Sequence, residues 1–180
     1  MTTISITQSD VFATLRSFLL AILPAGTEVV QAQQNDVGEP VGPDFVVMNS
    51  IASPRLATSV DSYADSGTNP GTRNSMQAIE ARLQLDVHGP NGGDNAAIIS
   101  TLFRDEYACI QFATVNPDIQ PLYCENPRQM PFINAQNNYE QRWIIELAIE
   151  YNPITQTPQD FADEVIPQIV SVDAAYPPGA

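Results

Sequence analysis

The sequence contains no lysine, and this absence shapes its electrostatics. All seven basic residues are arginines, against 21 aspartates and glutamates, so the formal net charge is −14 at pH 7. A charge of this sign repels phosphate backbones, which argues against a protein that binds tightly around nucleic acid. Two interpretations stay open: a surface past which DNA slides without binding, or an acidic soluble protein with no relation to DNA.

Cysteine and histidine are scarce too. The chain has two cysteines, Cys109 and Cys124, and one histidine, His88. These residues stand in none of the spacings that zinc sites use, and two thiols do not define a disulfide framework. We therefore expect buried free thiols, no metal and no cofactor. His88 falls on the polar side of an alternating segment with no nucleophile placed beside it, so no catalytic triad is predicted and no enzyme is expected.

Long hydrophobic runs are absent as well. The longest apolar stretch covers residues 11–23 and includes Arg16, which is short of the roughly 18 residues that a membrane helix needs. The first residues lack the basic start of a signal peptide. We expect a protein that is made and used in the cytoplasm, without a membrane. At 180 residues and 43% hydrophobic content, one domain can bury its core without disulfide or metal support.

Two helices are predicted from apolar residues at a period of 3.6. The first covers residues 11–22, where the apolar positions form one stripe, and Ser9 or Asp10 is its predicted cap. The second covers residues 94–110, with Asp94 as its predicted cap. Each helix has one apolar face for a core.

Alternation of two sets of positions, one of them wholly apolar, predicts two long strands at residues 79–88 and 143–151. In the first of these, the polar positions include Glu80, Asp86 and His88, which we expect to face solvent. Shorter extended segments are predicted at residues 28–33, 45–51, 55–63 and 166–172.

Turn-forming residues mark the predicted loops. Residues 64–75 (ADSGTNPGTRNS) show no periodicity and are predicted as a long hairpin loop. Four prolines punctuate residues 116–138, which are also predicted as loop, and residues 157–160 are predicted to cap one short turn. The glycine-rich run at 89–93 lacks a following Gly-Lys-Ser/Thr, so it indicates a turn that feeds a helix rather than a phosphate-binding loop.

These elements predict an α/β (α+β) fold. One mostly antiparallel or mixed sheet is packed on one face by two main helices, with long loops and an extended C-terminal arm. Residues 1–151 are predicted to form an α/β sandwich core. Residues 152–180 are predicted to form an extension that packs on the core or on a neighbouring subunit.

The candidate functional residues are charged and suit interaction rather than catalysis. Arg104, Asp105 and Glu106 form a run on the outside of the second predicted helix, either as a solvated surface or as an inter-subunit salt-bridge site. Acidic candidates for a surface that faces DNA lie on the polar strand face and in the predicted hairpin loop: Glu80, Asp86, Asp61 and Asp65.

A series of short motifs resembles the neck terminator family of tailed phages. They occur in order over nearly the whole chain: 15–19 (LRSFL), 23–26 (LPAG), 34–35 (QN), 39–40 (EP), 44–48 (DFVVM), 86–90 (DVHGP), 102–106 (LFRDE), 121–123 (PLY), 142–143 (RW), 158–162 (PQDFA) and 176–178 (YPP).

The resemblance implies a structural virion protein of the phage neck or tail, assembled in the host cytoplasm. Similar terminators form a hexameric ring of α/β sandwich subunits. The ring closes the tail tube and joins it to a head-side connector or stopper protein. DNA passes through the lumen without specific binding, and no catalytic residues carry over. We expect acidic side chains to line that lumen and repel the genome.

Three other functions stay open. An acidic DNA mimic that inhibits a nucleic-acid-binding protein fits the charge but needs no ring. A small hydrolase would require a pocket around His88 or a pair of carboxylates. A neighbouring connector layer, such as a head-completion stopper, is a third alternative.

Overall fold

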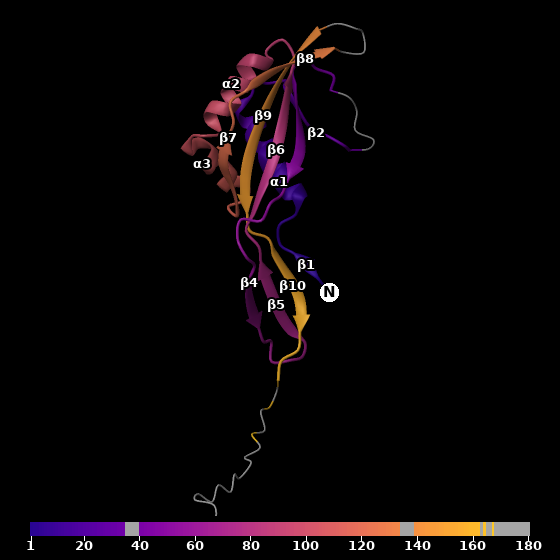
Figure 1. Ribbon diagram of the computed structural model, residues 1–180, viewed down its shortest axis with the longest axis vertical. Coiled ribbons are helices and arrows are strands. Elements are labelled where there is room, and N and C mark those ends of the chain that lie inside the picture. The colour runs from indigo at the N-terminus through magenta and orange to yellow at the C-terminus, as the bar shows by residue number, and fades with distance from the viewer. Residues whose placement is uncertain (35–39, 134–138, 163, 165–166, 168–180) are drawn as a thin grey trace, which may run out of the picture.

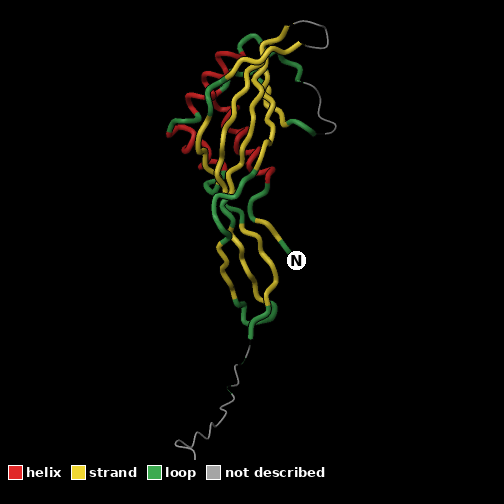
Figure 2. The backbone as a smooth tube through the Cα atoms, viewed as in Figure 1, coloured by secondary structure: helices red, strands yellow, loops and turns green. Residues whose placement is uncertain are grey.

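The protein has a mixed α/β fold, as predicted. The computed structural model describes residues 1–34, 40–133, 139–162, 164 and 167, with the backbone alone at 131 and 132. Within these ranges it has three helices and ten strands arranged in two sheets. The larger sheet and the helices form the wide part of an elongated molecule, and the smaller sheet extends from it (Figure 1). Loop segments connect the two parts (Figure 2).

The larger sheet is mostly antiparallel, in agreement with the sequence prediction. Its order is β2-β3-β6-β9-β7, and β8 also pairs with β9. Only the β2–β3 pair is parallel among these described pairings. The strands are β2 (Glu28–Gln31), β3 (Phe45–Ala52), β6 (Ile79–His88), β7 (Ile119–Cys124), β8 (Arg128–Ile133) and β9 (Tyr139–Tyr151).

A second, smaller sheet was not predicted. Its order is β1-β10-β5-β4, with every pair antiparallel. The strands are β1 (Thr3–Ile4), β4 (Val60–Ala64), β5 (Gly71–Met76) and β10 (Ile154–Gln159). Residues 64–75 are therefore a hairpin whose second arm is β5, and residues 157–160 lie largely in β10 rather than in a turn. These strands lack apolar alternation, and pairing with distant segments supplies their backbone hydrogen bonds.

Two further predictions about irregular segments were wrong. Residues 116–138 contain β7 and β8 despite their prolines. Both are edge strands that pair with β9 on one side, and an edge strand tolerates a proline because its outer side needs no N–H donor. The segment 55–63 is shorter than predicted: it forms a strand from Val60, and Arg55 makes an isolated bridge to Ile79. The strand predicted at 166–172 lies outside the described residues, except for position 167.

The helices cover one face of the larger sheet. They are α1 (Gln8–Ile22), α2 (Gly92–Leu102) and α3 (Glu106–Val115). Helix α1 contacts β2, α2 contacts β6 and β9, and α3 contacts β7. The apolar positions of β6 point toward them, with Leu85 and Val87 fully buried. The core thus forms between the apolar faces of the helices, which repeat every three or four residues, and the apolar face of the sheet, which repeats every second residue.

The second predicted helix is in fact two helices. Helix α2 ends at Leu102, and Asp105 then adopts an extended conformation and accepts a hydrogen bond from the Tyr107 N–H as the N-cap of α3. An aspartate at a helix start satisfies a backbone donor that would otherwise lack a partner. Asn91 precedes α2 as its N-cap residue, so the cap predicted at Asp94 was wrong, and Asp94 lies in the first turn.

Helix α1 begins earlier than predicted, after Thr7 rather than after Ser9 or Asp10. Thr7 and Asp10 form a capping box: the Asp10 N–H donates to the Thr7 hydroxyl at 3.3 Å, and the Thr7 N–H donates to the Asp10 carboxylate at 2.7 Å. Two backbone donors at the start of the helix are satisfied in this way.

Replacing Thr7 with alanine is expected to lower the free energy of unfolding by about 1 kcal/mol. The hydrogen bond from the Thr7 hydroxyl, and then that from its backbone N–H, lowers the pKa of Asp10. A lowered pKa in the folded state gives stability that is present above the ordinary carboxyl pKa of about 3.9. That stability is lost as the pH falls through the lower folded value. Urea unfolding of the wild-type protein and of Thr7→Ala, at neutral pH and below about pH 3, measures the difference in their free energies of unfolding. This difference should be smaller in acid.

Ser9→Ala is the matched control for the capping box. Ser9 is exposed, and its replacement is expected to change stability by no more than about 0.5 kcal/mol. Equal losses in the two variants would contradict the assignment of Thr7 as the cap.

Candidate assembly surfaces

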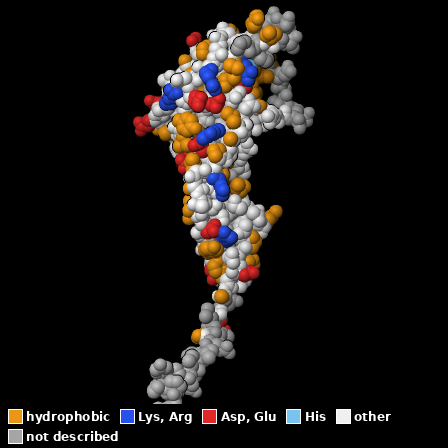
Figure 3. All heavy atoms as spheres, viewed as in Figure 1, with side chains coloured by type: hydrophobic (Ala, Val, Ile, Leu, Met, Phe, Trp, Pro, Cys, Tyr) orange, Lys and Arg blue, Asp and Glu red, His pale blue; other side chains and the backbone are white. Residues whose placement is uncertain are grey.

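The face of the larger sheet opposite the helices carries a row of ion pairs. Arg142 pairs with Asp86 at 3.0 Å, Arg82 pairs with Glu80, and Arg128 pairs with Glu146. Basic and acidic side chains lie next to one another along this view of the molecule (Figure 3). One pair lies within β6, one joins β6 to β9 and one joins β8 to β9, so these three acidic side chains each have a basic neighbour.

Two candidates for a DNA-facing surface, Asp86 and Glu80, lie within this row. Asp86 is 6% exposed and accepts hydrogen bonds from Asn49, Gln84 and Arg142. Glu80 is 8% exposed and accepts from Arg82 and from the Tyr123 hydroxyl. The expectation that these carboxylates face solvent was wrong, because side chains from β6 itself and from other strands of the sheet cover them.

His88 is also buried rather than solvent-facing. Its ring stacks on Phe45, with centroids 4.6 Å apart and planes inclined by 6°. Its Nδ1 lies 3.2 Å from the Glu140 carboxylate. These contacts place His88 in the packing between β3, β6 and β9.

All three residues of the run 104–106 are exposed, and two of them also hold the local structure through hydrogen bonds. Arg104 donates through Nε to the Cys124 carbonyl at 2.7 Å and also contacts Asn126, which ties the α2–α3 junction to the end of β7. Asp105 caps α3. Glu106 lies exposed in the first turn of α3. An interaction with another subunit stays a prediction for all three.

The acidic candidates of the smaller sheet lie on the β4–β5 hairpin. Asp61 accepts hydrogen bonds from Ser75 and Arg73, and these hold its pKa below the ordinary value. Asp65 accepts from the Gly67 N–H in the loop between the strands. Both acids are exposed, and their role in a contact or a lumen stays a prediction.

The two cysteines differ in their surroundings. Cys124 is buried, and burial raises the pKa of its thiol to about 11. Cys109 is exposed, so the prediction of two buried thiols was wrong for this residue.

The glycine-rich turn at 89–93 donates hydrogen bonds to the carboxylate of Asp44. Asp44 accepts hydrogen bonds from the Asn91 N–H at 2.9 Å and from the Asn91 side-chain amide at 2.7 Å. Gly89 has a φ of 104°, and a Cβ there would lie 2.2 Å from the Pro43 carbonyl oxygen. The turn therefore connects β6 to α2 by close contact with the start of β3.

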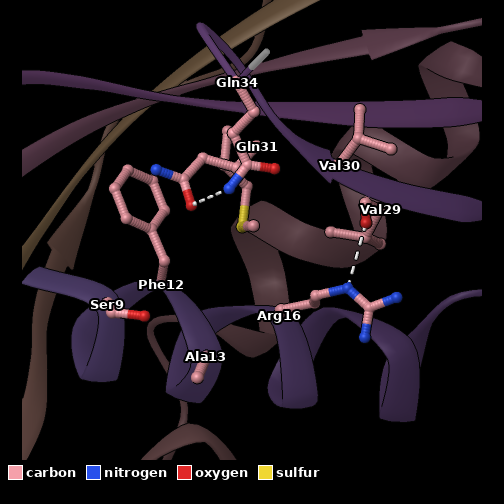
Figure 4. Close-up of a pocket in the computed structure, with 9 residues that line it drawn as sticks. Ser9, Phe12, Ala13, Arg16, Val29, Val30, Gln31 and Gln34 are labelled. Atoms are coloured by element: carbon pink, nitrogen blue, oxygen red, sulfur yellow. Dashed lines mark hydrogen bonds between the residues drawn. The ribbon is translucent and has the colours of Figure 1, made fainter. Parts of the chain in front are cut away.

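A hollow of about 350 Å³ lies between α1 and the edge strand β2. Arg16 extends from α1 and donates through Nε to the Val29 carbonyl at 3.1 Å, while the side-chain amide of Gln34 donates to Gln31 (Figure 4). Phe12 lines the same hollow from the helix. Arg16 thus links α1 to the backbone of β2 beside this hollow.

The family model for phage neck terminator proteins matches residues 9–175. The chain belongs to the phage neck terminator family. As a member, it is a structural component of a phage virion, which confirms the resemblance seen in its motifs.

One solved structure with a similar fold is described as a sheath/tube terminator of an extracellular contractile injection system, PVC, in the extended state. It is 12% identical, with a TM-score of 0.48, and the match covers 94% of this chain. The neck terminator chain spans 64% of that structure's length. No curated protein matches the sequence.

Within the described ranges, no group of three or more His, Cys, Asp or Glu residues is placed to hold a metal ion. None of the three helices in those ranges combines the length and apolar character that crossing a membrane requires.

Proposed function

We propose that this neck terminator is the subunit of a hexameric ring that closes the phage tail tube and joins it to a head-side connector or stopper. The family match over residues 9–175 carries this proposal. The structure supports it with an exposed edge strand, β4, and with a sheet face whose charges are paired, so that little net charge opposes a contact there.

DNA passes through the lumen of this ring in our proposal, without specific binding. The net charge of −14 supports it, because phosphates are repelled from an acidic wall. Glu80 and Asp86 are buried in ion pairs, so they contribute little to such a wall. Asp65 and Glu106 keep exposed carboxylates with no arginine paired to them within the described part of the chain.

Light scattering over a concentration series, followed by electron microscopy, tests the ring. We expect a species of several 19.6 kDa chains with a central hole, formed either alone or on purified tail tubes. A compact monomer that ignores both tubes and head-side connectors would contradict the proposal and favour an acidic DNA mimic. Binding to the connector but not to tubes would instead assign the chain to a neighbouring layer.

Charge reversal tests the lumen. Asp65→Lys and Glu106→Lys rings are expected to retain more DNA than the wild-type ring at low salt, with the difference vanishing as salt screens the charges. A filter-retention assay with linear DNA measures this. If neither substitution increases retention, these two residues do not line the lumen.

A further inference from the structure

Most sheet edges of this protein are protected against pairing with another chain. Helix α1 packs against β2, and its Arg16 donates to the Val29 carbonyl. Strand β7 is packed by α3 and has a register shift after Pro121. Strand β8 contains Pro131, which has no N–H to donate. Prolines, bulges and covering elements are the means by which edge strands avoid intermolecular pairing.

The outer edge of β4 has none of these protections. All five residues of Val60–Ala64 are exposed, and Val60 and Tyr63 are 59% and 57% exposed. The strand contains no proline, and its pairing with β5 has no register shift. Among the described elements, its main packing partner is β5, and no helix packs on it. The opposite edge of this sheet, β1, is only two residues long.

The strands of the smaller sheet carry no net charge. Its four strands contain one acid, Asp61, and one base, Arg73, and these pair with each other at 2.6 Å. The sheet is therefore neutral in a chain whose net charge is −14. Copies of such an acidic chain repel one another over most of their surface, and a neutral contact avoids that repulsion.

We propose that β4 pairs edge to edge with a strand of a second copy of this chain. This inference rests on the proposed ring and identifies one of its subunit contacts. Because a β4–β4 contact would be two-fold and would close at two copies, ring closure requires a different strand of the next copy. Among the described edge strands, β1 (Thr3–Ile4), at the other edge of the smaller sheet, has no proline, no register shift and no helix packed on it, so it is the strand that β4 pairs with. The pairing supplies partners for the open backbone groups of β4 and covers part of Val60 and Tyr63.

Hydrogen exchange of the wild-type protein tests the contact directly. The amides of residues 60–64 in assembled rings are compared with those in chains diluted to monomers. We expect exchange in this segment to slow at least about tenfold on assembly, because β4 gains hydrogen-bond partners. Unchanged exchange at 60–64 in a ring that has formed would overturn the proposal, as would assembly that stops at a dimer.

A charge substitution gives an independent test. Ser62→Asp places a carboxylate on the neutral contact, and Gln129→Asp places the same charge on exposed strand β8 of the other sheet. We expect Ser62→Asp to raise the concentration for half assembly at least about tenfold and Gln129→Asp to change it by less than about twofold. Circular dichroism confirms that both variants are folded. Equal effects of the two substitutions would overturn the proposal.

The outcomes separate this inference from the proposed function. Wild-type chains that form no ring and ignore tail tubes would remove the proposed function itself. Wild-type rings in which β4 exchanges as in the free chain would keep the ring and place its subunit contact elsewhere.

Discussion

Replacing Phe18 with alanine is expected to lower the free energy of unfolding by about 3–5 kcal/mol. Phe18 of α1 is 1% exposed and contacts Phe103 and Phe112, with ring centroids 5.8 and 5.6 Å away. These three rings connect α1 to the α2–α3 junction and to α3. The substitution leaves a cavity at their centre that the surrounding helices cannot fill. A loss this large is a substantial part of the stability of a single domain.

Urea unfolding followed by circular dichroism measures the effect of Phe18→Ala. Leu20→Ala is the matched control, because Leu20 lies in the same helix but is 43% exposed. We expect the control to cost no more than about 0.5 kcal/mol. Comparable losses in both variants would show that the aromatic contacts are not central to the core.

Arg142→Gln is expected to have the second-largest effect, a loss of about 3 kcal/mol. The substitution leaves the carboxylate of Asp86, whose side chain is 8% exposed, without a cationic partner. Asn49 and Gln84 still donate to it, and the Arg142 side chain is 27% exposed, so the loss falls at the lower end for a broken buried pair. The double variant Arg142→Gln/Asp86→Asn should recover part of it, since no buried charge is then left unpaired.

Arg128→Gln is the control for Arg142→Gln, because it breaks an ion pair on the same face of the sheet. The side chains of Arg128 and Glu146 are 58% and 40% exposed. Water therefore screens the pair, and we expect its loss to cost at most about 1 kcal/mol. If the two arginine variants unfold at the same urea concentration, burial of Asp86 does not contribute as described.

In our proposals the larger sheet stabilises the subunit and the smaller sheet contacts a neighbouring subunit. The larger sheet has its core and its internal ion pairs within one chain, as the expected effects at Phe18 and Arg142 reflect. Among the described elements, no helix packs on the smaller sheet, and its outer strand β4 is exposed. These differences are the reason that we assign stability to the larger sheet and subunit contact to the smaller sheet.

The sequence alone determined the elements whose side chains repeat regularly. Apolar residues every three or four positions predicted α1, and apolar residues at every second position predicted β6 and the part of β9 from Trp143 to Tyr151. These patterns also implied helices on one face of a mostly antiparallel sheet. They succeed because a regular period puts every apolar residue of an element on one side, whatever the rest of the chain does. The ordered motifs likewise indicated the family.

Only the tertiary structure decided which polar residues found partners and where irregular segments paired. Asp86 and Arg142 are 56 residues apart, and nothing in the local pattern of either shows that β6 and β9 place them side by side. Strands β5 and β10 lack apolar alternation, and they form because segments about 80 residues apart supply each other's hydrogen bonds. Local periodicity reports which side of an element is apolar. Burial of a charge and the pairing of a polar strand depend on contacts between distant residues, which exist only once the chain has folded.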